Sequence, residues 1–335
     1  MFLSKSKYCL LWQCPKLLWL EKNRPELKAG DVAREDRMTV GNEVGDLAMG
    51  LFGPFTETTV LKEDGWPDIP AMLKKTRQCI DKGIENICEA AFSYEGLYCA
   101  VDILRKEKGG YAIYEVKSST HAAEIYGVDI AYQKYVLEHC GVHVTGTYLV
   151  CINTDYVRGE KLEIQRLFQV VDMADPVAVE YPMVESRLAV AEKTLASETE
   201  PECSIGEHCR NPYKCAYWNH CTRSLPSPSV FDLYRIHFKK ALEYYRKGTV
   251  SFPDLLTEPT LSDKHLQQIR HELSEQEDDI NKDGIRDFLN TLSYPIYFFD
   301  FESMSRSFLN IPAASPMSTS PSNILCITLK PPEVN

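Results

Sequence analysis

The chain has 335 residues, of which 44% are hydrophobic, enough for the packed core of one large domain or of two ordinary ones. Its formal net charge of -11 argues against a broad nonspecific nucleic-acid-binding surface, which needs clustered Lys and Arg. No run of about 18 apolar residues is present, and Gln13 and Pro15 interrupt the apolar run near the start. We therefore expect neither a membrane span nor a signal peptide.

Twelve cysteines are too few for a disulfide scaffold in a chain of this length. Three of them cluster in a short segment that also contains Pro, Asn and His, a composition that favours metal ligation in a reducing compartment. The expected location is therefore the cytoplasm.

The pattern along the first half predicts an α/β core. A helix is expected from Ser4 to Leu20, broken at Cys14-Pro15 because proline interrupts a helix, and two more at 40–51 and 69–82. Strands at 87–92, 97–104 and 111–116 form a meander with a turn at 106–110. A helix over 121–139 and a strand over 142–152 complete the core.

The second half contains a predicted domain boundary. A helix over 181–197 leads to the cysteine segment at 201–222, and the Ser- and Pro-rich residues 224–229 indicate a linker. Beyond the linker we expect charged helices at 230–247 and 263–277 and a buried strand at 294–301. The predicted divisions are 1–223, 224–292 and 293–335.

An acidic pair and a lysine are expected on the meander. Glu115 and Lys117 share one face of a strand because side chains alternate. A turn centred between Lys108 and Gly109 places Asp102 directly opposite Glu115. Two opposed carboxylates repel each other unless they share a proton or a cation, and Mg²⁺ or Mn²⁺ prefers such oxygen ligands.

Such an ion polarises a phosphodiester and lowers the pKa of a bound water, with Lys117 beside it to stabilise developing negative charge. Gln133 and Tyr135 on the following helix are added to this catalytic set. The alternative is an exposed charged face in which Asp102, Glu115 and Lys117 form salt bridges, since Glu-x-Lys alone is a weak signal.

Four cysteines, at 203, 209, 215 and 221, are separated by five residues each. Zinc sites prefer pairs two to four residues apart, so this looser spacing favours an iron-sulfur cluster. With Cys14 there are five candidates for four positions, and His208 and His220 lie among them. Several of these thiols could instead be ordinary buried cysteines.

These residues resemble the RecB-like PD-(D/E)xK nucleases that carry an iron-sulfur cluster, including the four-cysteine CRISPR-associated exonucleases. The resemblance covers about residues 1–222: Cys14-Pro15-Lys16-Leu17-Leu18-Trp19 is similar to their N-terminal segment, and Asp102 with Glu115-Val116-Lys117 matches their catalytic motif. It implies a restriction-endonuclease-like core, a mixed sheet flanked by helices. It also implies a structural 4Fe-4S cluster on Cys14, Cys209, Cys215 and Cys221, with Cys203 surplus.

By the same resemblance, Asp102, Glu115 and the carbonyl of Val116 hold Mg²⁺ or Mn²⁺, and Lys117 assists hydrolysis of DNA, expected at single-stranded ends. Two departures stand out. The family's early Gly-x-x-x-His has Gly45 at the histidine position, where Glu43 or Asp46 is a possible substitute, and its Gln-x-x-x-Tyr is Gln133-Lys134-Tyr135.

The C-terminal part resembles the start of a DnaQ-like, RNase H-like exonuclease domain, which an uncharacterised bacterial family joins to this nuclease core. Tyr297-Phe298-Phe299-Asp300-Phe301-Glu302 is similar to the first motif of that domain, in which Asp300 and Glu302 bind metal. A chain that ends at Asn335 lacks the remaining motifs, so we expect a truncated and inactive domain.

Two functions of different class follow. The first is a metal-dependent DNA exonuclease with a structural cluster. The alternative is a catalytically inactive nucleic-acid-binding or adaptor protein whose cysteines hold zinc or a cluster, favoured by the acidic balance and the missing histidine.

Overall fold

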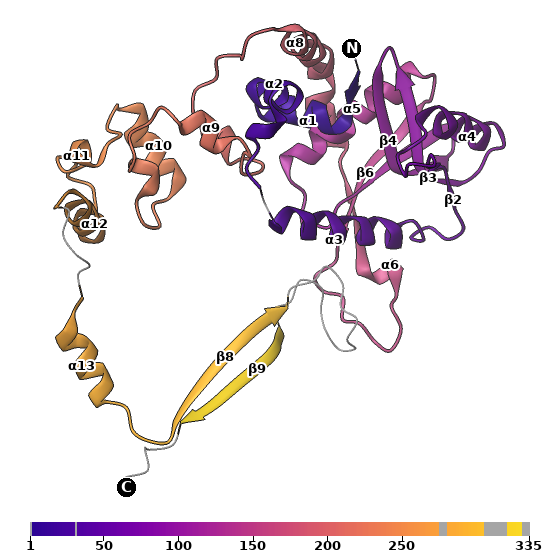
Figure 1. Cartoon of the computed structure of the whole chain (residues 1–335). Helices are drawn as coiled ribbons and strands as arrows, with labels where there is room; N and C mark the ends of the chain where they lie inside the picture. Colours follow the sequence, from indigo (N-terminus) through magenta and orange to yellow (C-terminus); the bar gives the residue numbers. More distant parts are fainter. Residues whose placement is uncertain (1, 31, 275–279, 305–319, 330–335) are drawn as a thin grey trace. The chain divides into compact units, whose positions relative to one another are not determined.

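The computed structural model describes residues 2–30, 32–274, 280–304 and 320–329 (Figure 1). Among these, the chain forms two units. The first comprises the residues up to Ser204 and His208–Trp218, and the second comprises Ile205–Glu207, Asn219–Met304 and the last strand. The first unit thus ends at Trp218, close to the boundary expected at residue 223. Each unit is described by itself.

A seven-stranded mixed sheet forms the centre of the first unit. Its order is β2-β3-β4-β5-β6-β7, and β1 pairs with β4. The β3-β4-β5 meander and the β6-β7 pair are antiparallel, whereas β5-β6, β2-β3 and β1-β4 are parallel. The strands are β1 Leu3–Ser4, β2 Thr56–Glu57, β3 Asn86–Tyr94, β4 Leu97–Glu107, β5 Gly110–Val116, β6 Val144–Ile152 and β7 Phe168–Asp172.

Helices cover both faces of this sheet (Figure 1). Those of the first unit are α1 Lys5–Gln13, α2 Pro15–Asn23, α3 Val32–Ala48, α4 Ile69–Asp81, α5 Glu124–His139, α6 Ile164–Leu167, α7 Ala174–Glu180 and α8 Val184–Ala196. One core cluster joins α1, α4, α5, α7 and α8 to the sheet, and another joins α3 and α6 to the opposite face. The predicted α/β class with a mixed, helix-flanked sheet is therefore confirmed.

Strand β5 shows how the alternation of side chains serves both faces. Tyr111 and Ile113 belong to the core under α5, whereas Ala112, Tyr114 and Val116 belong to the core under α3. By the same alternation, Glu115 falls on the face that α5 covers, so a carboxylate enters an apolar layer.

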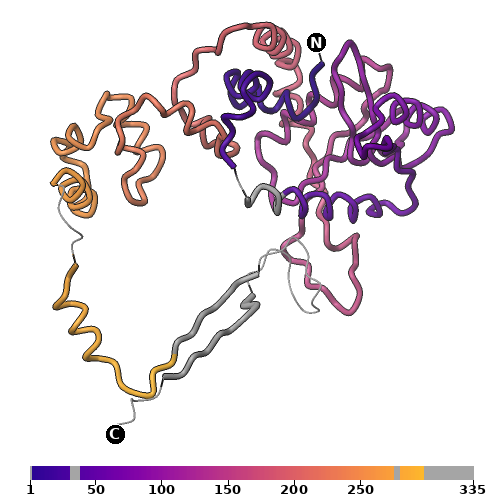
Figure 2. Tube along the Cα trace, in the orientation of Figure 1, coloured from indigo at the N-terminus to yellow at the C-terminus, as the bar shows by residue number. Residues whose placement is uncertain are grey.

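Helices α1 and α2 are hydrogen-bonded to the last residues of the first unit (Figure 2). Cys14 is the extended joint between α1 and α2, with Pro15 opening α2, as the sequence predicts. Buried Gln13 donates to the carbonyls of His208 and Tyr213 at 2.8 and 2.7 Å. Trp19 donates to the carbonyl of Ser197 at 2.9 Å. We call these contacts of Gln13 and Trp19 with residues 197–213 the clasp. They close loops of 178 to 200 residues, about the separation between Cys14 and the downstream cysteines expected to bind a metal cluster.

The second unit has its own small core. Among the described residues it contains α10 Phe238–Arg246, α11 Phe252–Leu255, α12 Asp263–Ser274, α13 Lys282–Asn290, β8 Ile296–Met304 and β9 Ser320–Leu329, and α9 Trp218–Thr222 opens it. Val230, Tyr244, Phe252 and Ile269 pack together. No helix in the described ranges is both long and apolar enough to cross a membrane.

Strands β8 and β9 form an antiparallel pair in which Asp300 is in register with Leu325 and Glu302 with Asn323. The expected strand at 294–301 is therefore present with shifted ends. The side chains of Asp300 and Glu302 lie outside the described part of the structure, so their role in metal binding stays a prediction.

Some predicted elements have different bounds. The helix expected over 230–247 is a short 3-10 turn, Val230–Asp232, followed by α10, because Ser229 and Asp232 form a capping box and Arg235 has a positive φ. The helix expected at 40–51 begins earlier and ends at Ala48. β7 and α7 were not anticipated, since the edge strand 168–172 is short and largely exposed.

The clasp yields a stability prediction. Gln13→Leu removes two hydrogen bonds and leaves two carbonyls without their donor, which should lower the free energy of unfolding of the first unit by about 2 kcal/mol. Urea denaturation measures this. Gln78→Leu, the same change at an exposed position of α4, is the control. Equal stabilities of the two variants would show that Gln13 does not hold the clasp.

Candidate functional site

The β4-β5 hairpin sets the register of the site. Glu107 pairs with Gly110, and the ladder continues to Ile103 opposite Tyr114. The two turn residues are therefore Lys108 and Gly109, whose φ of +91° suits glycine. This is the register predicted from an even turn. The paired ladder stops at Ile103 and Tyr114, one position short of Asp102 and Glu115.

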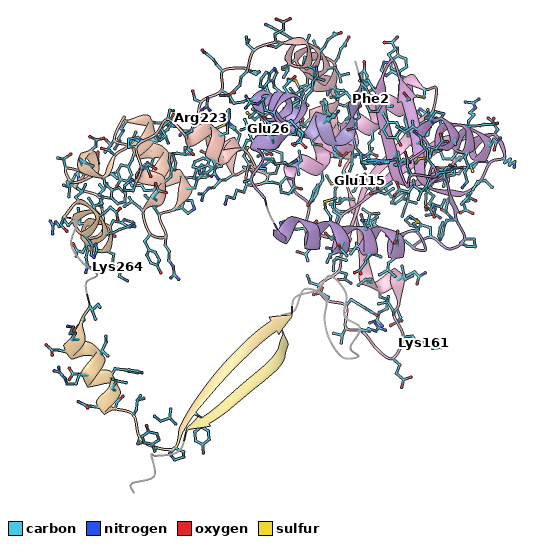
Figure 3. All side chains as sticks on the ribbon, in the orientation of Figure 1. Phe2, Glu26, Glu115, Lys161, Arg223 and Lys264 are labelled. Carbon is cyan, nitrogen blue, oxygen red and sulfur yellow. The ribbon has the colours of Figure 1, made fainter. Side chains whose placement is uncertain are left out.

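The two acids meet at one ammonium group. Lys5 Nζ lies 3.0 and 3.1 Å from the two carboxylate oxygens of Glu115 and 3.5 Å from Oδ1 of Asp102. The other Asp102 oxygen accepts a hydrogen bond of 2.7 Å from the backbone N–H of Val116. The Glu115 side chain, labelled in Figure 3, is 1% exposed. The predicted juxtaposition of these carboxylates on one side of the sheet is thus present.

Alternation next to Ile103 and Tyr114, both under α3, puts Asp102 and Glu115 on the opposite face, and the pattern becomes irregular just beyond Asp102. Cys88 and its partner Ile103 belong to the core under α3, whereas the next pair of the ladder, Ala90 with Val101, belongs to the core under α5. The residue between them on β3 is Glu89, whose φ is +54°, in the left-handed region. Glu89 lines the pocket from this irregular position of β3, and Asp102 lines it from β4.

Helix α5 supplies the other side of the acid pair. Gln133, fully buried, donates from Nε2 to Glu115 at 2.7 Å and to Asp129 at 3.0 Å. Lys117 Nζ contacts Glu115 and lies 3.1 Å from Asp129. The amide orientation follows from chemistry, because carboxylates accept hydrogen bonds and cannot donate them. Gln133 and Asp129 are four residues apart, one helical turn, so both face the sheet.

The electrostatics of the pair are unequal. Burial favours a neutral Glu115, but Lys117 and Lys5, with the hydrogen bonds of Lys117 and Gln133, outweigh it and lower the pKa of Glu115 below its ordinary range. For Asp102, burial and the charge of Glu115 dominate and raise its pKa to about 6. Burial opposes the charged form of Lys5, yet Asp102 and Glu115 raise its pKa above the ordinary value.

A polar pocket of about 360 Å³ opens beside these groups. It is lined by Lys5, Gly41, Asn42, Gly45, Asp46, Glu89, Asp102, Glu115, Val116, Lys117 and Ser118. Helix α3 thus contributes one wall. Of the two acids weighed as substitutes for the missing histidine, Asp46 lines the pocket and Glu43 does not. Burial, and then the charge of Asp102, raise the pKa of Glu89 to about 7.

Tyr135 is not brought to this site. Its ring packs against His139 at a centroid distance of 4.0 Å and near Tyr181 at 6.2 Å. It does not line the pocket. Two residues along a helix turn the side chain by about 200°, so Tyr135 and Gln133 face different directions.

Three residues at the site were not predicted. Asp129 carries a signal, because it lies one turn before Gln133 on the same helix. Glu89 lies on the strand adjacent to Asp102, but its role depends on an irregular backbone that no alternation pattern reveals. Lys5 belongs to the N-terminal segment, and only tertiary structure places it here.

A second group of possible metal ligands lies at the clasp. Within the described ranges, Cys14, Cys203 and His208 have ligand atoms within 4.8 Å of one another. The Cys14 and Cys203 sulfurs are 3.4 Å apart, and His208 Nε2 is 3.4 Å from Cys203 Sγ. Burial raises the pKa of the Cys14 thiol to about 12. The structure thus provides a group that could hold a metal ion.

This group differs from the expected ligand set. Cys203, which the resemblance made surplus, lies next to Cys14, whereas Cys209 and Cys215 do not join the group of three. The backbone N–H of Cys215 donates to the Cys209 carbonyl at 2.9 Å. Burial is the main cause that raises the pKa of the Cys215 thiol, and the charge of nearby Cys203 raises it further. Cys221 belongs to the second unit.

Comparison with known proteins adds no relative to this picture. The chain matches no protein-family model, and no curated protein matches it. The chemistry of the site is therefore argued from its own residues: a buried acid pair, two lysines and a polar pocket on one side, and a thiol-imidazole group at the clasp.

Proposed function

We propose that the chain is a metal-dependent nuclease that hydrolyses DNA phosphodiesters, with Asp102, Glu115 and Lys117 as its PD-(D/E)xK set. The observation that carries the proposal is the meeting of Asp102 and Glu115 around one cation, the Lys5 ammonium, at the wall of a polar pocket. The resemblance to RecB-like nucleases supports the same set, and the hairpin register agrees with it.

The donor set fits a hard divalent ion. Two carboxylates from adjacent strands supply oxygen ligands, and a positive charge already lies within 3.5 Å of both. Val116 lines the pocket, so its carbonyl is a further oxygen donor there. Mg²⁺ or Mn²⁺ at this position would polarise a phosphoryl oxygen and lower the pKa of a bound water.

The protein's own side chains hold the Lys117 ammonium and the Glu115 carboxylate in place. Asp129 and Glu115 hold the Lys117 ammonium between them, which fixes its position beside the pocket. There it can stabilise negative charge that develops on a phosphate oxygen. Gln133 fixes the Glu115 carboxylate, and its own Oε1 has no hydrogen-bond partner among the described residues, which leaves an acceptor for a water.

The charge of the pocket limits which substrates can bind there. Lys5 and Lys117 line the pocket together with four acidic residues, so the pocket is not basic as a whole. A phosphodiester could approach these acids only once a bound divalent ion offsets their charge. The resemblance to RecB-like nucleases implies single-stranded DNA ends, and we propose them as the substrate.

The first prediction concerns Glu115. Glu115→Gln keeps the shape but removes a metal ligand charge, which should cost several kcal/mol of transition-state stabilisation and lower the cleavage rate at least about 100-fold. The assay uses end-labelled single-stranded DNA with Mg²⁺ or Mn²⁺. EDTA should abolish cleavage by the unaltered chain.

Glu107→Gln makes the same chemical change at the other end of the hairpin and should leave the rate unchanged. A protein that cuts DNA equally well with and without the Glu115 carboxylate would refute the proposed site. No cleavage by the unaltered chain at any metal concentration would favour the adaptor alternative.

We also propose, from the resemblance, that Cys14, Cys209, Cys215 and Cys221 bind a structural 4Fe-4S cluster. Burial keeps the Cys14 thiol neutral in the absence of a cation, and a soft metal supplies the charge that a thiolate needs. The proximity of Cys14, Cys203 and His208 favours a second candidate, a mononuclear zinc site.

A pair of serine variants separates these two ligand sets. If the cluster is present, anaerobically purified protein is brown and contains about four iron atoms per chain. Cys209→Ser should then lose iron and colour, while Cys203→Ser keeps them. About one zinc per chain that is lost in both Cys203→Ser and His208→Ala, with no iron, would contradict the cluster and establish the zinc site.

A further inference from the structure

Lys5 occupies the position that a metal ion would take. Its Nζ lies 3.0 to 3.5 Å from oxygens of both Glu115 and Asp102. Mg²⁺ bound by the same two carboxylates requires the same lone pairs at about 2.0 to 2.1 Å. An ammonium and a divalent cation at such close range repel each other strongly, so the two positions exclude each other.

The backbone holds Lys5 at this place. β1 pairs in parallel with β4 at Leu97 and Tyr98, and the Leu3 N–H donates to the Gly96 carbonyl at 3.0 Å. The Leu3 carbonyl in turn accepts a hydrogen bond of 2.6 Å from Tyr132 on α5. Lys5 directly follows β1 as the first residue of α1, so its side chain starts from a fixed point.

The side chain itself can move. Lys5 is 21% exposed and lines the pocket, and four flexible methylene groups separate its ammonium from the fixed backbone. Glu115 does not depend on Lys5 alone, because Lys117 and Gln133 also contact it. Among the described residues, Lys5 is the one lysine that forms an ion pair with Asp102, so Lys5 chiefly relieves the repulsion between the two acids.

We propose that Lys5 is a positioning residue that holds the Asp102–Glu115 pair in the metal-free protein and competes with the divalent ion for it. The inference rests on the proposed function, since it takes this pair as the metal site. Metal binding requires the ammonium to withdraw toward the pocket. The apparent affinity is therefore reduced by the fraction of molecules in which Lys5 has left the pair.

The test is a Mn²⁺ titration of the full chain, stripped with a chelator, by isothermal titration calorimetry. Lys5→Met keeps the length of the side chain without its charge and should bind Mn²⁺ at least about tenfold more tightly, since the competitor is gone. Lys7→Met, two residues along α1 and not lining the pocket, makes the same change in net charge and should alter the affinity less than twofold. Lys5→Arg keeps a cation and should bind no more tightly than the unaltered chain.

Thermal unfolding gives a readout that a structural role would not move. Lys5→Met should melt at a lower temperature without metal, because the acids lose a counter-charge, yet gain more from added Mn²⁺ than the unaltered chain does. A lysine that merely supports the fold would lower the melting temperature and leave the gain from Mn²⁺ the same. Equal or weaker Mn²⁺ binding by Lys5→Met overturns the proposal.

Failure of the proposed function looks different. Suppose that Lys5→Met binds Mn²⁺ more tightly, that Glu115→Gln abolishes Mn²⁺ binding, and that no variant cleaves DNA. The competition between Lys5 and the metal is then supported, and the nuclease function is refuted. If the unaltered chain cleaves DNA with Mn²⁺ but Lys5→Met shows no gain in affinity, the nuclease stands and the competition does not.

Discussion

The buried carboxylate of Glu115 is the constraint on which the first unit depends. It is 1% exposed on the sheet face covered by α5, where an uncompensated charge is costly. The compensation comes from Lys5 in the N-terminal segment, Lys117 two residues later and Gln133 on α5. Three separate parts of the chain, the N-terminal segment, the end of β5 and helix α5, are thereby held around the Glu115 side chain.

The N-terminal segment is tied at two places by different means. At one end, β1 and Lys5 join the sheet and the acid pair. At the other, Gln13 and Trp19 bond to carbonyls of the residues that follow α8, and Cys14 lies against Cys203. A metal at the clasp and a metal at the acid pair would therefore act on opposite ends of the same short helix, α1.

Patterns in the sequence predict what local geometry controls. The hairpin register followed from the two-residue turn at Lys108-Gly109, and the helix break followed from Pro15. Gln133 was predicted at the site and lies there, whereas Tyr135, two residues on, faces away. The acidic pair, and the helix that supports it, were thus within reach of strand and helix periodicity.

What the sequence did not predict depends on long-range placement or on irregular backbone. Glu89 lines the pocket and itself has a left-handed backbone conformation within a strand, which the regular alternation of side chains does not predict. The proximity of Cys203 to Cys14 depends on how the residues after α8 return to α1. Spacing along the chain shows which cysteines are neighbours in sequence and says little about which of them meet Cys14.

The charges around Asp102 and Glu115 favour one order in which metal and substrate bind. Lys5 and Lys117 offset two of the three negative charges of Asp102, Glu115 and Asp129, which places the acids when no metal is bound. A divalent ion that replaces Lys5 brings one more positive charge to the pair and releases an ammonium at the wall of the pocket. In the proposed nuclease the pocket would become more positive as the ion binds, and its affinity for a phosphodiester would rise with it. Under that proposal, metal and substrate binding would be coupled, because each would favour the conformation in which Lys5 has left the acids.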